Sequence, residues 1–184
     1  MKAKMKTKDP RAKIYELTIG WLYPELMSTY GDRGNIMVLE KRCEWRGIDV
    51  KVVPINFSTT IHDLSSINLL FGGGAQDRQQ GILIDDLRKN KGQTLKRMID
   101  DGIPGLFVCG SPQLLGHYYM NGEGEQLEGL GIFDMVSKHF GKDTPRCIGN
   151  LVASLNSQFS RLHLPSARAD GGQAIFNKIT KSKL

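Results

Sequence analysis

The order of apolar and polar positions along the chain predicts strands and helices in alternation. Four short apolar runs are typical of strands: residues 14–22, 48–55, 67–71 and 105–109. Two longer segments, 31–47 and 81–101, are typical of helices with one apolar face. Strands that alternate with helices form βαβ crossovers, so we expect a three-layer α/β/α domain around a mostly parallel sheet.

The first of these helices carries signals for its start and its end. Asp32 or Asn35 is suited to cap it, and Gly47 is suited to end it. Cys43 falls on the same helical face as Ile36, so we interpret it as a small core residue. In the second helix the residues expected to face inward are Leu95, Met98 and Ile99.

Candidate chemistry lies after the third and fourth predicted strands. The segment GGGAQDRQQ, residues 72–80, follows the third strand, and Cys109 follows the fourth. Sites on parallel sheets gather at the carboxyl ends of strands, and consecutive glycines let a backbone approach a ligand and present its amides. The glycines alone are also compatible with a tight turn, and Cys109 alone with the last buried residue of a strand. Together they favour a site.

Cys109 is followed by Gly110 and by a proline that suits the first turn of a helix. A strand-turn-helix holds a nucleophile clear of the sheet, and the N–H groups at the start of the helix favour a thiolate. The same N–H groups can stabilise an oxyanion, as acyl transfer requires. The pattern therefore predicts a cysteine nucleophile.

Charge and composition narrow the alternatives. The net charge of +6 comes from the ends: residues 1–13 hold six basic groups against one acidic, and residues 159–184 hold five against one. The other 145 residues hold 14 basic and 17 acidic groups. We interpret the first segment as a solvated basic tail, and no nucleic-acid-binding motif supports a nucleic-acid partner.

The compartment follows from the cysteines and from the N-terminal residues. Three cysteines without CxxC spacing, and no apolar signal segment before them, favour a reduced, cytoplasmic protein. No apolar run approaches the length of about 18 residues that a membrane span needs. No metal site or cofactor is expected, and GGGAQ lacks the Gly-Lys-Ser/Thr of a P-loop.

Five motifs carry a resemblance to a known family. In order they are LYPELMSTYGDRGN, GGGAQDRQQ, CGSPQLLG, LEGLGIFD and RCIGNL. Their order and spacing resemble the class I glutamine amidotransferase-like subunits of the cobyric-acid-synthase type, over residues 14 to about 158. The resemblance implies hydrolysis of L-glutamine to glutamate and ammonia for an ATP-dependent ligase of the MurT kind. Such a ligase amidates the D-glutamate of lipid II, in peptidoglycan synthesis.

The resemblance also implies roles for individual residues. Cys109 would attack the side-chain amide of glutamine, and Gly73, Gly74 and Gly110 would supply oxyanion-hole amides. Gln113, in the family's Cys-x-x-x-Gln position, would lie beside the bound glutamine. The planar fork of Arg146 would receive a carboxylate. Structural alternatives stay open: Gln113 as a helix cap and Arg146 as a surface ion pair.

Other positions of the motifs have structural or site interpretations. Asp32 and Asn35 belong to the first motif, where a helix cap and a site role are weighed equally. For Asp77 and Arg78 we favour a structural ion pair or a partner contact. At positions 111 and 112 the family usually has Gly-Tyr where this chain has Ser-Pro, a departure expected to affect the fit of the substrate.

The family's general acid and base is one histidine in a Gly-Thr-Tyr-Leu-His-Gly-Pro motif, which the printed sequence does not contain. The positions of His62, His117 and His139 in the sequence do not predict contact with Cys109, and no family motif surrounds His163. We therefore expect an incomplete amidotransferase domain at 14–158, a divergent tail at 159–184 from an altered reading frame, and impaired hydrolysis.

Two alternatives to a glutaminase remain. The first is a non-catalytic pseudo-amidotransferase that keeps a glutamine pocket or a partner surface. The second is another cysteine hydrolase on the same fold, with His163 or water in place of the family's base.

Overall fold

The computed structural model describes residues 15–141, 143–144, 150 and 152. All helices and strands described below lie within one compact unit, Met1–His139. The expected domain boundaries, after residues 13 and 158, lie outside the described residues, as does Arg146.

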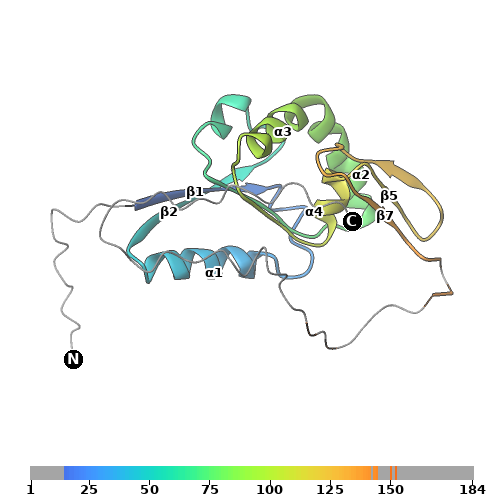
Figure 1. Ribbon diagram of the computed structural model, residues 1–184, viewed down its shortest axis with the longest axis horizontal. Helices are drawn as coiled ribbons and strands as arrows, with labels where there is room; N and C mark the ends of the chain where they lie inside the picture. Colours follow the sequence, from blue (N-terminus) through green and yellow to red (C-terminus); the bar gives the residue numbers. More distant parts are fainter. Residues whose placement is uncertain (1–14, 142, 145–149, 151, 153–184) are drawn as a thin grey trace. The chain divides into compact units, whose positions relative to one another are not determined.

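The main sheet has four parallel strands in the order β2-β1-β3-β4 (Figure 1). These strands are β1 (Tyr15–Leu22), β2 (Ile48–Ile55), β3 (Leu69–Gly72) and β4 (Gly105–Phe107). The helices are α1 (Arg33–Glu44), η1 (Ile61–Leu64), α2 (Asp77–Asp86), η2 (Leu87–Lys91), α3 (Gly92–Asp100) and α4 (Gly110–Leu115). The parallel sheet predicted from the alternation of strands and helices is confirmed.

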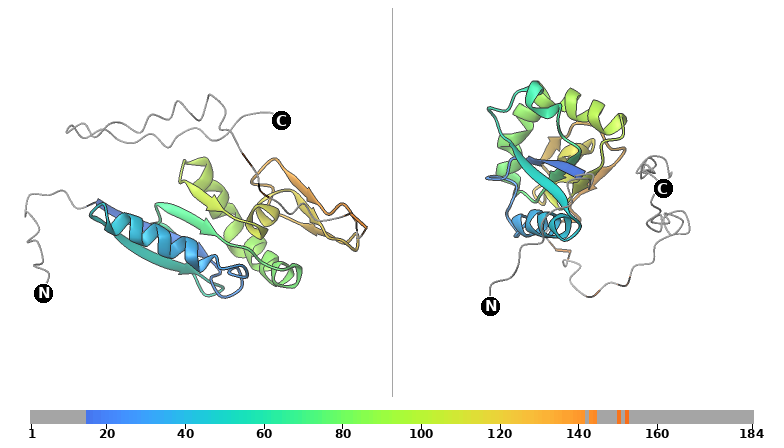
Figure 2. Two further views of the ribbon diagram at one scale, coloured as in Figure 1. Left: turned by 90° about the horizontal axis from the view of Figure 1, so that it is seen from below. Right: turned by 90° about the vertical axis from the view of Figure 1, so that its left-hand side faces the viewer.

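Alternation of side chains along the strands places helices on both faces of the sheet (Figures 1 and 2). On one face Ile19 and Trp21 of β1 pack with Ile36 of α1. On the other face Leu22 belongs to the larger core, which contains Leu83 and other buried residues of α2, η2 and α3. The result is the expected three-layer arrangement.

The first helix begins as expected, but its capping residue acts elsewhere. Asp32 occupies the N-cap position and makes no side-chain capping hydrogen bond. Its buried carboxylate instead accepts the N–H of Gly74, 3.0 Å away. Gly47 has a φ of 67° and lies three residues after Glu44, the last helical residue, so it ends the turn that follows the helix. Cys43 is half-buried.

The single helix predicted at 81–101 is in fact two α-helices joined by a π-helical turn, and it starts earlier, at Asp77. Of the residues expected to face inward, Leu95 is buried, and Met98 and Ile99 pack partly buried against the core. The π turn η2 inserts an extra residue into the helical pattern. This insertion accompanies two charged residues that are buried at its ends, Asp86 and Lys91.

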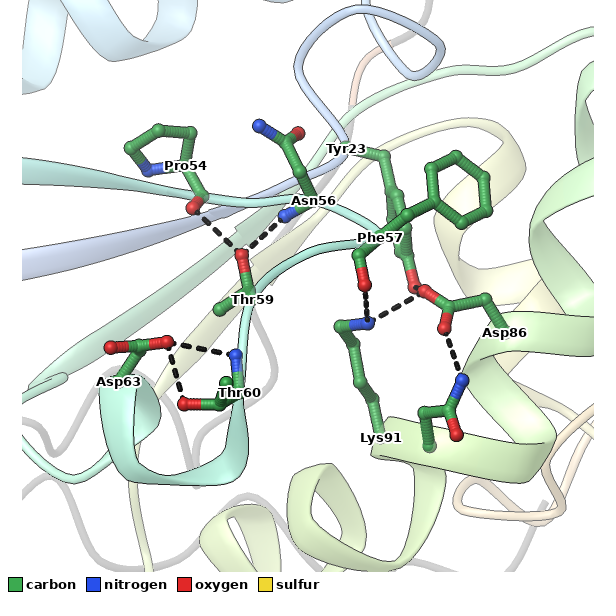
Figure 3. Close-up of polar contacts among 10 residues, drawn as sticks. Tyr23, Pro54, Asn56, Phe57, Thr59, Thr60, Asp63, Asp86 and Lys91 are labelled. Carbon is green, nitrogen blue, oxygen red and sulfur yellow. Dashed lines mark hydrogen bonds and ion pairs between the residues drawn. The ribbon is translucent and has the colours of Figure 1, made fainter.

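Asp86 is the centre of a buried polar network (Figure 3). Its carboxylate accepts hydrogen bonds from the Tyr23 hydroxyl at 2.5 Å, Lys91 Nζ at 2.6 Å and Asn90 Nδ2 at 2.7 Å. Lys91 is only 2% exposed and also lies 3.4 Å from the Phe57 carbonyl oxygen. The network therefore joins the carboxyl end of β1, the segment after β2, and the helices over the sheet.

The network shifts the pKa values of two of its members, Asp86 and Tyr23. Burial alone raises the pKa of Asp86, but hydrogen bonds from Asn90, Lys91 and Tyr23 and the charge of Lys91 outweigh burial and lower it. Burial and the Asp86 carboxylate raise the pKa of Tyr23 far above its ordinary value. At neutral pH the network thus holds Asp86 as a carboxylate and Tyr23 as a protonated phenol.

A second, three-stranded sheet follows α4 and was not predicted. Its strands, in the order β6-β5-β7, are β5 (Tyr118–Met120), β6 (Gln126–Glu128) and β7 (Val136–Lys138). β5 and β6 form an antiparallel hairpin, whose turn contains Gly124 with a φ of 83°. The dipeptide Asn121-Gly122 in this turn was the available sequence signal, because Asn-Gly between two apolar runs is typical of a hairpin.

The helices of the described residues are also too short and too polar to cross a bilayer.

We predict that Asp86→Ala destabilises the protein by about 3–5 kcal/mol, because the substitution leaves the buried Lys91 ammonium without its partner. Asp85→Ala is the matched control: Asp85 lies on the same helix and pairs with Lys89 at the surface, each side chain 72% exposed. The control should cost roughly 0.5 kcal/mol or less. Urea denaturation of the three proteins at neutral pH measures both differences.

The stability gap between wild type and Asp86→Ala should also depend on pH. The lowered pKa of Asp86 gives the folded state an advantage above the carboxyl's ordinary pKa, and this advantage is lost as pH falls through the folded-state value. The gap should therefore narrow in acid. A gap that stays constant with pH would show that the charge of Asp86 contributes nothing.

Candidate active site

Cys109 lies on a strained turn between β4 and α4. Its backbone angles are φ 57° and ψ −107°, in a region that residues other than glycine rarely occupy. Such a conformation costs about 1–3 kcal/mol and persists only where the surroundings impose it. The Cys109 side chain is exposed. The alternative of a last buried strand residue is therefore wrong, and the predicted strand-turn-helix geometry is present.

The glycine loop after β3, defined as residues 73–75, lies against this turn. β3 and β4 are neighbours in the sheet, with Gly72 opposite Phe107. A Cβ atom built on Gly74 would lie 3.2 Å from the Cys109 sulfur, and one on Gly73 would lie 2.2 Å from the Met27 carbonyl oxygen. Glycine at these positions thus keeps space beside the thiol and permits close backbone packing.

Each residue of the glycine loop is held by a group from outside it. The Ser111 hydroxyl donates to the Gly73 oxygen at 2.6 Å, and the Gly74 N–H donates to Asp32 at 3.0 Å. The Thr29 N–H donates to the Gly74 oxygen at 3.2 Å, and the Gln80 amide donates to the Ala75 oxygen at 3.0 Å. The loop is therefore anchored on several sides, as a preorganised site requires.

These hydrogen bonds decide which predicted amides are available for an oxyanion. The Gly74 N–H is occupied by Asp32. Within the described part of the chain, the N–H groups of Gly73 and Gly110 donate to no backbone or side-chain acceptor. Of the three glycines predicted to supply oxyanion-hole amides, Gly73 and Gly110 have N–H groups without an acceptor among the described residues. The Gly74 N–H is not available, but the absence of a side chain at Gly74 leaves space beside the Cys109 sulfur.

Gln113 bonds to a buried residue, Gln80, for which the sequence pattern predicted no role. The Gln80 Nε2 atom lies 2.8 Å from the Gln113 Oε1 atom and donates to it, in addition to Ala75. Gln80 is 1% exposed, and its own Oε1 atom has no partner among the described residues. Gln113 is thus held in place by α2 instead of capping its own helix. The position of Gln80 within GGGAQDRQQ was the only signal for it.

Tyr119 of the second sheet is another residue near the thiol that the sequence did not reveal. Burial raises the pKa of its hydroxyl, and the charge and hydrogen bond of Asp77 and the proximity of Cys109 raise it further. Asp77 therefore acts on the titration of Tyr119, and no ion pair between Asp77 and Arg78 is present among the residues described. The alternative of a partner contact for these two residues stays a prediction.

The histidines lie as follows. His117 makes an exposed contact of 3.1 Å with Asp134. His62 is on η1, and His139 directly follows β7. His163 lies outside the described residues. In the described part of the chain no histidine is hydrogen-bonded to Cys109.

We predict that Cys109→Gly is more stable than Cys109→Ala by about 1 kcal/mol. Glycine relieves the strain of the positive φ, and its greater freedom in the unfolded chain offsets part of that gain. Cys43 provides a control of opposite sign, because glycine in α1 should be less stable than alanine by roughly 0.5–1 kcal/mol. Thermal denaturation of the four variants tests both, and equal stability of the two Cys109 variants would argue against strain.

Comparison with known proteins gives one domain family and two relatives that this chain resembles. Residues 18–167 match the CobB/CobQ-like glutamine amidotransferase domain. The chain is 39% identical over 139 residues to a Staphylococcus aureus (strain N315) protein named lipid II isoglutaminyl synthase (glutamine-hydrolysing) subunit GatD, covering 76% of this chain and 55% of that protein. It is 40% identical over 118 residues to the GatD subunit of Streptococcus pneumoniae (strain ATCC BAA-255 / R6), covering 64% of this chain and 45% of that protein.

The chain spans about half the length of the curated relatives it matches. The matched residues include both the glycine loop and the Cys109 turn. The extent of the domain match establishes that the chain belongs to the CobB/CobQ-like glutamine amidotransferase family.

Proposed function

We propose that this protein is a glutaminase subunit, with Cys109 as its nucleophile and L-glutamine as its substrate. The observation that carries the proposal is the exposed Cys109 thiol on a strained turn, next to a glycine loop that leaves room for a ligand. Backbone strain at an exposed cysteine is characteristic of functional sites, because an exposed side chain gains no packing energy that would offset the cost of the strain.

The proposed reaction proceeds through a thioester. The Cys109 sulfur bonds to the side-chain carbonyl carbon of glutamine, whose oxygen becomes negatively charged beside the N–H groups of Gly73 and Gly110. The carbon–nitrogen bond then breaks, and the nitrogen takes up a proton and leaves as ammonia. Water hydrolyses the resulting glutamyl thioester to glutamate and restores the thiol.

Gln113 and Arg146 have proposed roles in holding the substrate. Gln113 lies four residues after the nucleophile, and Gln80 fixes its side-chain oxygen, which leaves its amide nitrogen to face a ligand. Arg146 is proposed to receive a carboxylate of glutamine with two parallel hydrogen bonds.

We further propose that the ammonia goes to a MurT-like, ATP-dependent ligase subunit that amidates the D-glutamate of lipid II. The names of the two relatives support this acceptor, because both are subunits of lipid II isoglutaminyl synthase. ATP and the acceptor would bind the ligase subunit, and this chain would be its cytoplasmic glutamine-hydrolysing partner.

The proposal predicts ammonia release from L-glutamine when the chain is combined with its ligase subunit. The Cys109→Ala variant should release none above background, because no other group replaces the thiol. Coupled glutamate dehydrogenase assays measure the rate. Saturable glutamine binding without release, equal in wild type and Cys109→Ala, would favour the non-catalytic alternative.

The absence of the family's histidine motif from the printed sequence predicts slow proton transfer. Added imidazole should then accelerate ammonia release several-fold in the wild-type chain and leave Cys109→Ala unchanged. An equal rate with and without imidazole, at a measurable wild-type rate, would show that the protein has a base of its own.

A further inference from the structure

One peptide group beside Cys109 is held at both of its ends. The Gly73 carbonyl oxygen and the Gly74 N–H belong to the same peptide unit. The first accepts the Ser111 hydroxyl at 2.6 Å, and the second donates to the Asp32 carboxylate at 3.0 Å. Ser111 comes from the start of α4 and Asp32 from the residue before α1, so two separate elements hold opposite ends of this peptide.

Both holding side chains are buried. Ser111 is 1% exposed and Asp32 is 4% exposed. A hydrogen bond to a carboxylate is stronger than one between neutral groups, and burial excludes competing water. Rotation of the peptide would turn its oxygen toward the Asp32 carboxylate and its N–H toward Ser111. The two contacts therefore favour a single orientation of the peptide.

The surroundings also explain why these two residues act together. A Cβ atom on Gly73 would lie 2.7 Å from Asp32 Cβ and Cγ, and one on Gly72 would lie 2.5 Å from the Ser111 hydroxyl oxygen. Only glycine at positions 72 and 73 allows the backbone to approach both side chains this closely. The absence of a capping hydrogen bond from Asp32 to α1 agrees with its use on the loop.

We propose that Asp32 and Ser111 are positioning residues that fix the Gly73–Gly74 peptide for attack by Cys109 on a carbonyl carbon. The Gly73 N–H belongs to the preceding peptide, and the fixed peptide positions it by restricting the backbone rotation of Gly73. The inference rests on the proposed function, because a fixed amide matters only if an oxyanion forms there.

The experiment compares two reagents that modify Cys109 in the full chain. A chloroketone analogue of L-glutamine reacts through a tetrahedral adduct with a negatively charged oxygen, and ends with the sulfur bonded to the methylene carbon and chloride released. Iodoacetamide alkylates the thiol by direct displacement of iodide, with no such oxygen. Mass spectrometry of the Cys109 peptide gives both rates, so no turnover is needed.

Ser111→Ala and Asp32→Ala should lower the limiting rate of labelling by the chloroketone about tenfold or more, because a misplaced donor no longer stabilises the adduct. The chloroketone concentration that gives half of the limiting rate should stay within about twofold of the wild-type value, and so should the rate of alkylation by iodoacetamide. Neither ligand binding nor the reactivity of the thiol depends on the orientation of the peptide. Asp32→Asn should restore most of the rate, because its amide oxygen can still accept the Gly74 N–H.

Asp63→Ala is the matched control. Asp63 also accepts a backbone N–H, that of Thr60, at 2.8 Å, but it does so in the η1 turn (Figure 3). This variant should label like wild type with both reagents. If Asp32→Ala does not fold, Ser111→Ala still decides, because it removes only one hydroxyl group.

The outcomes separate the two proposals. Saturable chloroketone labelling of wild type, with unchanged rates in Ser111→Ala and Asp32→Ala, would overturn the positioning roles and leave the glutaminase proposal standing. Equal losses with both reagents would also overturn them, because a general disturbance of the thiol would then explain the result. If wild type shows no saturable labelling, the glutamine site itself is wrong, and the positioning roles fall with it.

Discussion

The parallel pairing of β3 with β4 is the constraint on which the candidate site depends. The register places Gly72 opposite Phe107, so the two strands end at the same level of the sheet. The segments that continue from them, the glycine loop and the Cys109 turn, then have to share the same space. That space exists only because Gly73 and Gly74 carry no side chains, as the 3.2 Å between a Cβ placed on Gly74 and the Cys109 sulfur indicates.

The same edge of the sheet concentrates backbone strain. Among the described residues, the non-glycine residues with positive φ are Tyr23, directly after β1, and Cys109, after β4. Tyr23 is held by its N–H to the Ile55 oxygen and by its hydroxyl to Asp86. The buried Asp86 network thus has a role beyond stability, because it stabilises an unfavourable conformation at the sheet edge that carries the candidate site.

Much of the fold could be predicted from local pattern, and the parts that could not involve contacts distant in sequence. The four parallel strands follow from short apolar runs, and the Cys109 turn follows from a strand end, a glycine and a proline. The π turn was not predictable, because Asp86 and Lys91 look like surface residues until the structure pairs them in the core. For Asp32 the sequence left a helix cap and a site role equally open for the same reason: its partner, Gly74, lies 42 positions away.

The chemistry proposed for this family separates into two parts with different locations in the sequence. In the proposed mechanism, stabilising the oxyanion and presenting the thiol are tasks of backbone geometry at neighbouring strand ends, and the residues proposed for these tasks lie between Asp32 and Gln113. Proton transfer needs one correctly placed side chain, and His117, the histidine nearest to Cys109 in sequence, contacts Asp134. The geometry of attack can therefore be complete in this part of the chain while proton transfer depends on groups elsewhere. For that reason the reactivity of Cys109 toward a glutamine analogue is a more direct measure of this site than turnover.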